Sequence, residues 1–304
     1  MISFQNLSGV YAAAVTPLKP DFSPDPETLP ALLDFLARRG CHGALLFGTT
    51  GEGPSFSSQE RLEMLKAALQ IRQTYPGFRL LLGTGTPSLT ETIQLTRAAF
   101  DLDIDGVVVL PPYYFRKVDD EGLFAWFSEL IQRAVPAGKA LLGYHIPPIT
   151  GVSLSPDLLS RLKDAYPDRF AGIKDSSADL DHARLVGDKF GADLLILNGT
   201  DRLLSQALQA GALGCITALG NLFSPDLRRV WEAHQRGETD EIAQNRLNTA
   251  RSLSEKYPPA PALLKMLLSY WHGLPLWPVR PPLLAMPAET IEKVLAEIEP
   301  LRND

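Results

Sequence analysis

A lysine near the middle of the chain ends an apolar run, at a position where its amine can become reactive. Residues 170–174 are compatible with a β-strand, and polar residues 175–177 follow at once. Strand alternation places Lys174 on the same face as Phe170 and opposite to Ala171. If that face is buried, loss of water disfavours the charged ammonium form, and the free amine can attack a ketone to form a Schiff base. The alternative is an ammonium group that reaches solvent from the end of the strand.

Polar and aromatic side chains follow other apolar runs in the same way. Residues 48–53, Gly-Thr-Thr-Gly-Glu-Gly, combine two hydroxyls with a glycine-rich backbone. This pattern suits a bound carboxylate, although a tight turn capped by threonine would look the same. Tyr113 and Tyr114 follow one run, and Tyr144 and His145 end another. A strand-end tyrosine can relay protons through its phenol or simply pack with its hydroxyl satisfied.

Taken together, these groups indicate one kind of chemistry. A desolvated lysine can form an imine with a 2-oxo acid, a loop of hydroxyls and backbone amides can hold the carboxylate, and a phenol can move the proton. The imine nitrogen then withdraws electrons from the adjacent carbon, so that an enamine can form. No metal is required for these steps.

The runs that carry these residues belong to a regular alternation of strands and helices. Strands are expected at residues 9–16, 43–47, 79–83, 106–110, 140–144, 170–174, 193–197 and 214–217. Amphipathic helices are expected between them, at residues 26–39, 58–73, 88–101, 119–135, 155–166, 180–190 and 202–210. Nearly continuous apolar strands indicate a parallel sheet buried on both faces, and eight strands close a (β/α)8 barrel. We therefore predict an α/β protein with a TIM barrel.

A doubly wound open sheet is the competing architecture, and it would usually carry a nucleotide-binding turn. Residues 83–85 lack the third glycine of the dinucleotide fingerprint, and the loop at Gly48 lacks the Gly-Lys-Ser/Thr of a P-loop. In a barrel, chemistry gathers at the carboxyl ends of the strands, which is where the candidate residues fall.

The pattern changes after Pro225, where helices follow one another without strands. These helices are expected at residues 226–236, 239–257, 260–271 and 288–301. Only the first is needed to complete the barrel. We expect a barrel with the active site at residues 1–224, and a closing helix with a C-terminal helical extension at residues 225–304.

Composition excludes several classes of protein. The 304 residues are 45% hydrophobic and carry a net charge of −6, which argues against nucleic acid and anionic membranes as partners. No run is long enough to span a bilayer, and Cys41 and Cys215 form no paired motif. Residues 1–15 lack a basic start and a long apolar run, so no signal peptide is expected. The histidines show no metal-ligand spacing. A cytoplasmic protein with a small-molecule substrate and no cofactor is expected.

Several motifs in order resemble the dihydrodipicolinate synthase / N-acetylneuraminate lyase family of class I Schiff-base pyruvate aldolases. They are Gly48-Thr49-Thr50-Gly51-Glu52, Tyr113-Tyr114, Tyr144-His145-Ile146-Pro147 with Thr150-Gly151, and Gly172-Ile173-Lys174-Asp175. The resemblance runs from about Gly9 to Asn221 and continues more loosely into the helical tail. It implies a TIM-barrel lyase or aldolase that forms a Schiff base with pyruvate or another 2-oxo acid.

The resemblance also implies roles for individual residues. Lys174 would form the Schiff base, and Tyr144 would donate and accept protons above the imine. Thr49 and Thr50 would bind the carboxylate, and Thr49 would join a hydroxyl relay with Tyr144. Tyr114 would complete that relay from a neighbouring subunit, which implies a homo-oligomer, typically a dimer of dimers.

Backbone positions that line the substrate pocket in the family are matched by Gly48, Gly199 and Ile216. Near the second substrate the chain departs from the synthase pattern, because His145 replaces an asparagine and Ile149 replaces an arginine. An isoleucine cannot make the bidentate anion contact of a guanidinium. This argues against dihydrodipicolinate synthase activity and leaves open an aldolase or dehydratase for a 2-keto-3-deoxy sugar acid, or an aldolase for a less polar aldehyde.

Other functions remain open at this point. One is dihydrodipicolinate synthase proper, another is a non-catalytic 2-oxo-acid-binding protein, and a third is a phosphate-binding barrel isomerase. His145 has two interpretations, as a contact of the aldehyde or as a hydrogen-bonded structural residue. Glu52 is expected to bond backbone near the pocket.

Overall fold

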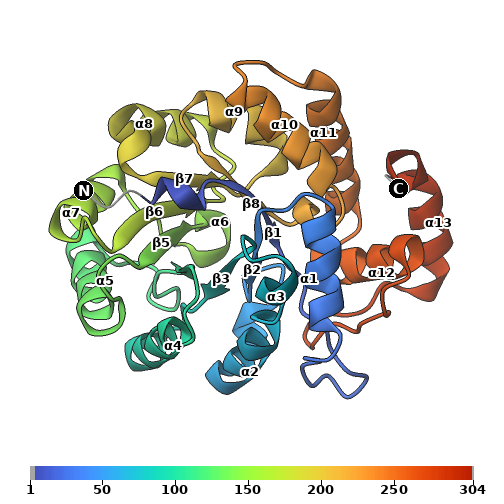
Figure 1. Ribbon diagram of the computed structural model, residues 1–304, viewed down its shortest axis with the longest axis horizontal. Helices are drawn as coiled ribbons and strands as arrows, with labels where there is room; N and C mark the ends of the chain where they lie inside the picture. Colours follow the sequence, from blue (N-terminus) through green and yellow to red (C-terminus); the bar gives the residue numbers. More distant parts are fainter. Residues whose placement is uncertain (1–3, 303–304) are drawn as a thin grey trace.

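The apolar runs of the first two thirds pair in sequence order into a closed parallel barrel, and β8 returns to pair with β1 (Figure 1). The computed structural model describes residues 4–302. The strands are β1(Gly9–Ala13), β2(Gly43–Leu46), β3(Arg79–Gly83), β4(Gly106–Val109), β5(Ala140–His145), β6(Phe170–Asp175), β7(Leu195–Asn198) and β8(Gly214–Thr217). The predicted α/β class and TIM barrel are confirmed.

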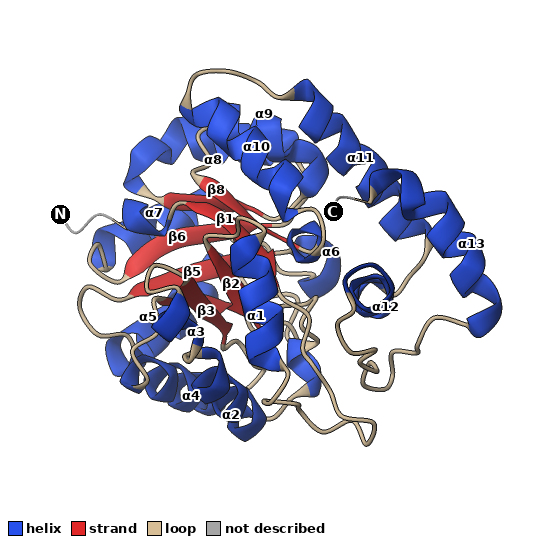
Figure 2. Ribbon diagram, turned by 45° about the vertical axis from the view of Figure 1, so that its right-hand side comes forward, coloured by secondary structure: helices blue, strands red, loops and turns tan. Residues whose placement is uncertain are grey.

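Helices cover the outside of this barrel and leave the strand ends open to loops (Figure 2). They are α1(Leu29–Arg38), α2(Ser58–Ala68), α3(Ile71–Thr74), α4(Leu89–Asp101), α5(Asp120–Ala134), α6(Pro147–Thr150), α7(Pro156–Ala165), α8(Leu180–Phe190) and α9(Leu204–Gln209). The N-terminus of α2 has a capping box, in which the Ser57 hydroxyl accepts from the Glu60 amide and the Glu60 carboxylate accepts from the Ser57 amide. The single helix expected at residues 58–73 is divided in two, and α6 has no counterpart among the expected helices.

Apolar side chains form two separate layers on the two faces of the sheet. The inner layer fills the barrel with residues from alternate positions of the strands, among them Tyr11, Leu45, Leu81, Val108, Leu142 and Ile216. The larger outer layer lies between the strands and the helices. A dry, filled interior is what removes water from a polar group placed at the top of the barrel.

The strand that carries the lysine does not alternate as expected. Ala171 belongs to the inner layer and Phe170 to the outer one, whereas Lys174 bonds inward to Tyr144. The prediction that Phe170 shares a face with Lys174, opposite to Ala171, is therefore wrong. The physical reason is an irregularity beside Gly172, where the pairing of β5 with β6 shifts register and φ is 154°.

Four further helices follow the barrel: α10(Ser224–Gln235), α11(Glu241–Lys256), α12(Ala260–His272) and α13(Ala288–Ile298). α10 packs on β1 and on α11, while α12 and α13 lie beside the barrel (Figures 1 and 2). Residues 274–287, between α12 and α13, contain no helix or strand. The barrel part expected at residues 1–224 and the extension expected at residues 225–304 each have an outer end, residues 1–3 and 303–304, that lies outside the described residues. Within residues 4–302, no helix is long and apolar enough to cross a bilayer.

Candidate active site

Three of the expected site residues meet at the carboxyl end of the barrel. The Lys174 ammonium donates to the phenol oxygen of Tyr144 at 3.0 Å, and its nitrogen lies 4.1 Å from the centre of the tyrosine ring. The Thr49 hydroxyl lies 3.2 Å from the same phenol oxygen. Lys174 and Tyr144 are paired neighbours on β6 and β5, which explains why residues 30 positions apart come together. Lys174 is only 3% exposed, so its amine is largely removed from water.

The environment of Tyr144 makes its phenol more acidic. Burial by itself would raise the pKa of Tyr144, but the charge of Lys174 opposes it, together with hydrogen bonds to Lys174, Thr49 and Ser176. The balance lowers the pKa of Tyr144 below its usual value. A phenol that releases its proton more readily is better suited to proton transfer near neutral pH.

The loop after β2 offers unused backbone donors beside the tyrosine. Its ends are closed by two hydrogen bonds, from the Glu52 amide to the Thr49 carbonyl at 3.1 Å and from the Gly53 amide to the Gly48 carbonyl at 3.0 Å. Within the described chain, no backbone carbonyl accepts from the amides of Thr49, Thr50 or Gly51. Backbone amides prefer to be paired, so three successive free N–H groups suit a carboxylate.

The hydroxyls of this loop lie at different depths. Thr49 is exposed and Thr50 is buried. Gly48 and Thr49 line a narrow internal cavity with Tyr144 and Arg61. Arg61 holds the far side of the loop, because its guanidinium donates to the Gly53 carbonyl at 2.6 Å and to the Gly83 carbonyl at 3.0 Å.

The remaining expected residues have more varied positions. Ile216 is fully buried in the inner layer. The Gly199 amide donates to the Asp175 carbonyl at 2.6 Å, and a side chain at Gly199 would collide with Ser176. Tyr114 is 76% exposed and contacts the ring of Phe115. Ile149, in the short helix α6, is 57% exposed.

His145 faces outward from the barrel wall and stacks on His182, with ring centres 4.3 Å apart. Its Nδ1 accepts the Leu154 amide at 3.0 Å, and burial lowers the pKa of His145 to about 4. The Nδ1 of His182 lies 3.0 Å from the carboxylate of Asp175. That contact raises the pKa of His182. His145 is therefore a neutral, hydrogen-bonded side chain at the outer end of β5.

The ligand atoms of His145, Asp175 and His182 lie within 4.8 Å of one another, which raises the question of a metal site. A backbone N–H always donates, so the Nδ1 of His145 must be an unprotonated acceptor and its Nε2 must carry the proton. A protonated Nε2 has no lone pair for a metal. The Nδ1 of His182 is already engaged with Asp175. The arrangement fits a polar cluster that fixes the ends of β5 and β6 better than a metal centre.

One important group near the site was only partly anticipated from the sequence. Glu52 is fully buried and bonds backbone, as expected, through its Oε2 and the Arg280 amide at 2.7 Å. Its Oε1 also pairs with the buried Lys265 of α12 at 2.7 Å. Lys265 is 213 positions away, and no local pattern links two such residues.

The sequence matches the dihydrodipicolinate synthetase family over residues 6–300. It is similar to an uncharacterized DapA-like lyase of Chloroflexus aurantiacus, with 39% identity over 292 residues that cover 96% of each chain. A 4-hydroxy-tetrahydrodipicolinate synthase of Cellvibrio japonicus is 33% identical over 236 residues, which are 77% of this chain and 78% of that one. The fold is similar to that of YagE from E. coli K12, a prophage protein of the dihydrodipicolinic acid synthase family solved in complex with pyruvate. The TM-score is 0.89, with 24% identity over 97% of this chain and 98% of that chain.

Proposed function

The chain belongs to the dihydrodipicolinate synthetase family, and we propose that it is a lyase that forms a Schiff base between Lys174 and pyruvate or a related 2-oxo acid. The observation that supports this most is the contact among a buried lysine, a tyrosine of lowered pKa and a threonine hydroxyl. A protein that only bound oxo acids would gain nothing from an imine-forming amine at this point.

In the proposed reaction, the neutral amine of Lys174 attacks the carbonyl carbon of the oxo acid and forms a carbinolamine. Tyr144 supplies the proton with which the hydroxyl leaves as water, so that an iminium ion remains. The carboxylate would accept hydrogen bonds from the free amides of the loop at Thr49 and Thr50. The Tyr144 phenolate then takes a proton from the carbon next to the iminium and leaves an enamine, which attacks the aldehyde and forms the carbon–carbon bond. In the reverse direction, that bond breaks in the iminium of the larger oxo acid, which releases the aldehyde and leaves the same enamine. In a 2-keto-3-deoxy sugar acid, the enamine formed at the methylene carbon expels the neighbouring hydroxyl, which leaves as water with the proton that Tyr144 returns.

The acceptor in this proposal is an aldehyde without a carboxylate next to Ile149. The aliphatic side chain and the neutral His145 provide no charge to pair with an anion. Dihydrodipicolinate synthase activity is the second candidate, favoured by the named synthase relative at 33% identity. A panel of aldehydes with and without a carboxylate, run with pyruvate in both directions, distinguishes the two. Binding of the oxo acid without turnover of any member would indicate a non-catalytic protein.

The proposal includes a homo-oligomer in the cytoplasm. Tyr114 and Phe115 are exposed on the loop after β4, at 76% and 68%. Two exposed aromatic rings on one loop are typical of an interface. In the proposed assembly, Tyr114 of a neighbouring copy extends the hydroxyl relay of Tyr144 and Thr49.

The decisive experiment is reductive trapping. The protein is incubated with pyruvate and borohydride and then weighed intact and after digestion. We expect one pyruvate adduct per chain on the peptide that contains Lys174, and none in Lys174→Ala. A control variant, Lys256→Ala, changes an exposed lysine of α11 and should trap as the wild type does. An adduct that persists in Lys174→Ala would contradict the proposal.

A further inference from the structure

The loop that carries Thr49 and Thr50 is held by a buried ion pair with the C-terminal helices. Glu52 follows Thr50 by two residues and has a left-handed backbone, with φ 56°. Its side chain is 0% exposed, and each carboxylate oxygen has a partner. Oε1 accepts from the Lys265 ammonium and Oε2 from the Arg280 amide, both at 2.7 Å.

Lys265 is as buried as its partner. Its side chain is 1% exposed, in the middle of α12, and its ammonium also donates to the Pro278 carbonyl at 2.7 Å. Burial lowers the pKa of Lys265, and the adjacent Glu52 carboxylate opposes this effect. A buried ion pair is a weak source of net stability, because both charges lose water, but it fixes the geometry of the groups that it joins.

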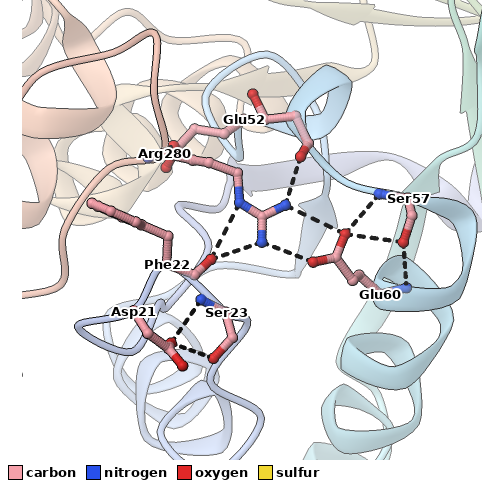
Figure 3. Close-up of polar contacts among 8 residues, drawn as sticks. Asp21, Phe22, Ser23, Glu52, Ser57, Glu60 and Arg280 are labelled. Carbon is pink, nitrogen blue, oxygen red and sulfur yellow. Dashed lines mark hydrogen bonds and ion pairs between the residues drawn. The ribbon is translucent and has the colours of Figure 1, made fainter.

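Arg280, whose amide donates to Glu52, also holds the surrounding segments through its guanidinium. Its guanidinium donates to the Phe22 carbonyl at 2.7 Å and to Glu60 at 2.8 Å (Figure 3). It also donates to the Ser55 carbonyl at 2.6 Å and lies 4.1 Å from the centre of the Phe56 ring. Arg280, which follows α12, therefore contacts Glu52 in the loop after β2 as well as Glu60 in α2.

We propose that Lys265 and Glu52 are positioning residues, through which the C-terminal helices hold the amides of Thr49, Thr50 and Gly51 in the arrangement that receives the carboxylate. The proposal rests on the function proposed above. It assigns to the extension a role in the affinity for the oxo acid and none in proton transfer. It also explains why an ion pair occupies a place where apolar side chains would pack at lower cost.

The test compares Lys265→Met, Glu52→Gln and the double variant with the wild type. Methionine keeps the length of the lysine without its charge, and glutamine keeps the shape of the carboxylate. The matched control is Lys256→Met with Glu297→Gln, a Lys–Glu pair at 2.6 Å that joins α11 to α13, with the lysine exposed and the glutamate half-buried. Each variant is assayed at a temperature well below its own melting point.

We expect each single variant to raise the pyruvate concentration for half-maximal trapping at Lys174 at least tenfold. The trapping rate at saturating pyruvate should change less than threefold, and the control pair should behave as the wild type. The double variant should need no higher pyruvate concentration for half-maximal trapping than the more impaired of the two single variants, because both residues act through one contact. A folded Lys265→Met with wild-type half-saturation overturns the proposal. Should that variant not fold, the same outcome for Glu52→Gln overturns it.

Hydrogen exchange separates this proposal from the proposed function. The Glu52 and Gly53 amides are hydrogen-bonded within the loop, so their exchange reports its geometry without any ligand. We expect peptides that contain residues 48–56 to exchange faster in Lys265→Met, while peptides of β6 are unchanged. If the wild type forms no adduct but the loop still loosens, only the proposed function fails. An unchanged loop contradicts the positioning role whatever the ligand results are.

Discussion

At the scale of single residues, Tyr144 connects the groups of the candidate site. The Lys174 ammonium donates to its phenol oxygen, and the Thr49 hydroxyl shares a hydrogen bond with the same oxygen. The barrel rule selects all three from the sequence, because Tyr144 and Lys174 lie near the carboxyl ends of strands and Thr49 lies in the loop after one. Lys265 could not be predicted in this way, because its contact with Glu52 depends on the position of α12 beside the barrel. No spacing in the sequence indicates that position.

Replacement of Tyr144 by phenylalanine removes the phenol and keeps the packing of the ring. We expect turnover to fall by roughly 10²–10⁴-fold, because proton transfer by a positioned side chain contributes about that much. Borohydride should still trap some adduct at Lys174, since the amine remains. As control, Thr49→Ser keeps the hydroxyl partner and should lose much less.

The dependence of turnover on pH provides a second test of the role proposed for Tyr144. In the proposed reaction, Tyr144 can donate a proton only while it is protonated, so turnover should fall as the pH rises through its pKa. Because that pKa is lowered, the fall should come at lower pH than for an ordinary tyrosine, and it should disappear in Tyr144→Phe. Turnover of the phenylalanine variant within threefold of the wild type, with the same profile, would exclude the role.

At the scale of elements, β6 shows where sequence reasoning reaches its limit. The existence of the strand, its place as sixth of eight and its end near Lys174 are all predictable from apolar runs and polar turns. The faces of its first residues are not, because a shift of one position exchanges inside and outside. Gly172 was the only visible sign, and a glycine in a strand has several explanations.

We predict that Gly172→Ala is strongly destabilising. A Cβ at Gly172 would lie 2.0 Å from the Leu195 carbonyl oxygen of β7. The backbone φ of Gly172 is 154°, a value that residues with a side chain rarely adopt. We expect a loss on the order of 3 kcal/mol or more in the free energy of unfolding, and loss of trapping at Lys174, because β6 must move away from β7. Urea unfolding followed by circular dichroism measures the first effect.

The matched control is Gly77→Ala, before β3. A Cβ at Gly77 would meet no atom within 4 Å. That variant should be neutral or more stable by up to about 1 kcal/mol, since alanine restricts the unfolded chain. Equal unfolding midpoints for the two variants would show that the irregularity of β6 does not need glycine.

At the scale of the whole molecule, the barrel and its extension are joined by polar contacts as well as by apolar packing. Helices after residue 225 were predictable from their periodicity, and so was the number of strands. The role that we propose for these helices was not predictable, because it depends on the buried Glu52–Lys265 pair and on the Arg280 amide, which lies in a segment without regular structure. The family resemblance, carried by motifs of the barrel, says least about this part of the chain.

A half-buried histidine, His42, and a buried one, His145, are expected to make the stability of the folded chain sensitive to acid. His42 accepts the Val10 amide and His145 the Leu154 amide, each at its Nδ1, and a protonated imidazole cannot accept. Burial lowers the pKa of both to about 4. Since an unfolded histidine has a pKa of about 6.5, the unfolded chain binds protons first as the pH falls.

We therefore expect each histidine to cost roughly 2 kcal/mol of unfolding free energy between pH 7.5 and pH 5, and nothing above pH 7.5. Asparagine at both positions keeps an acceptor near the place of Nδ1 and does not titrate. In urea unfolding at the two pH values, the double asparagine variant should lose less stability than the wild type. The His182→Asn variant should lose more stability than the wild type when the pH is lowered from 7.5 to 5. The reason is that the raised pKa of His182 stabilises the folded chain mainly at acid pH, and the variant lacks this contribution. An equal pH dependence in the wild type and the double variant would show that neither histidine is held neutral by its backbone contact.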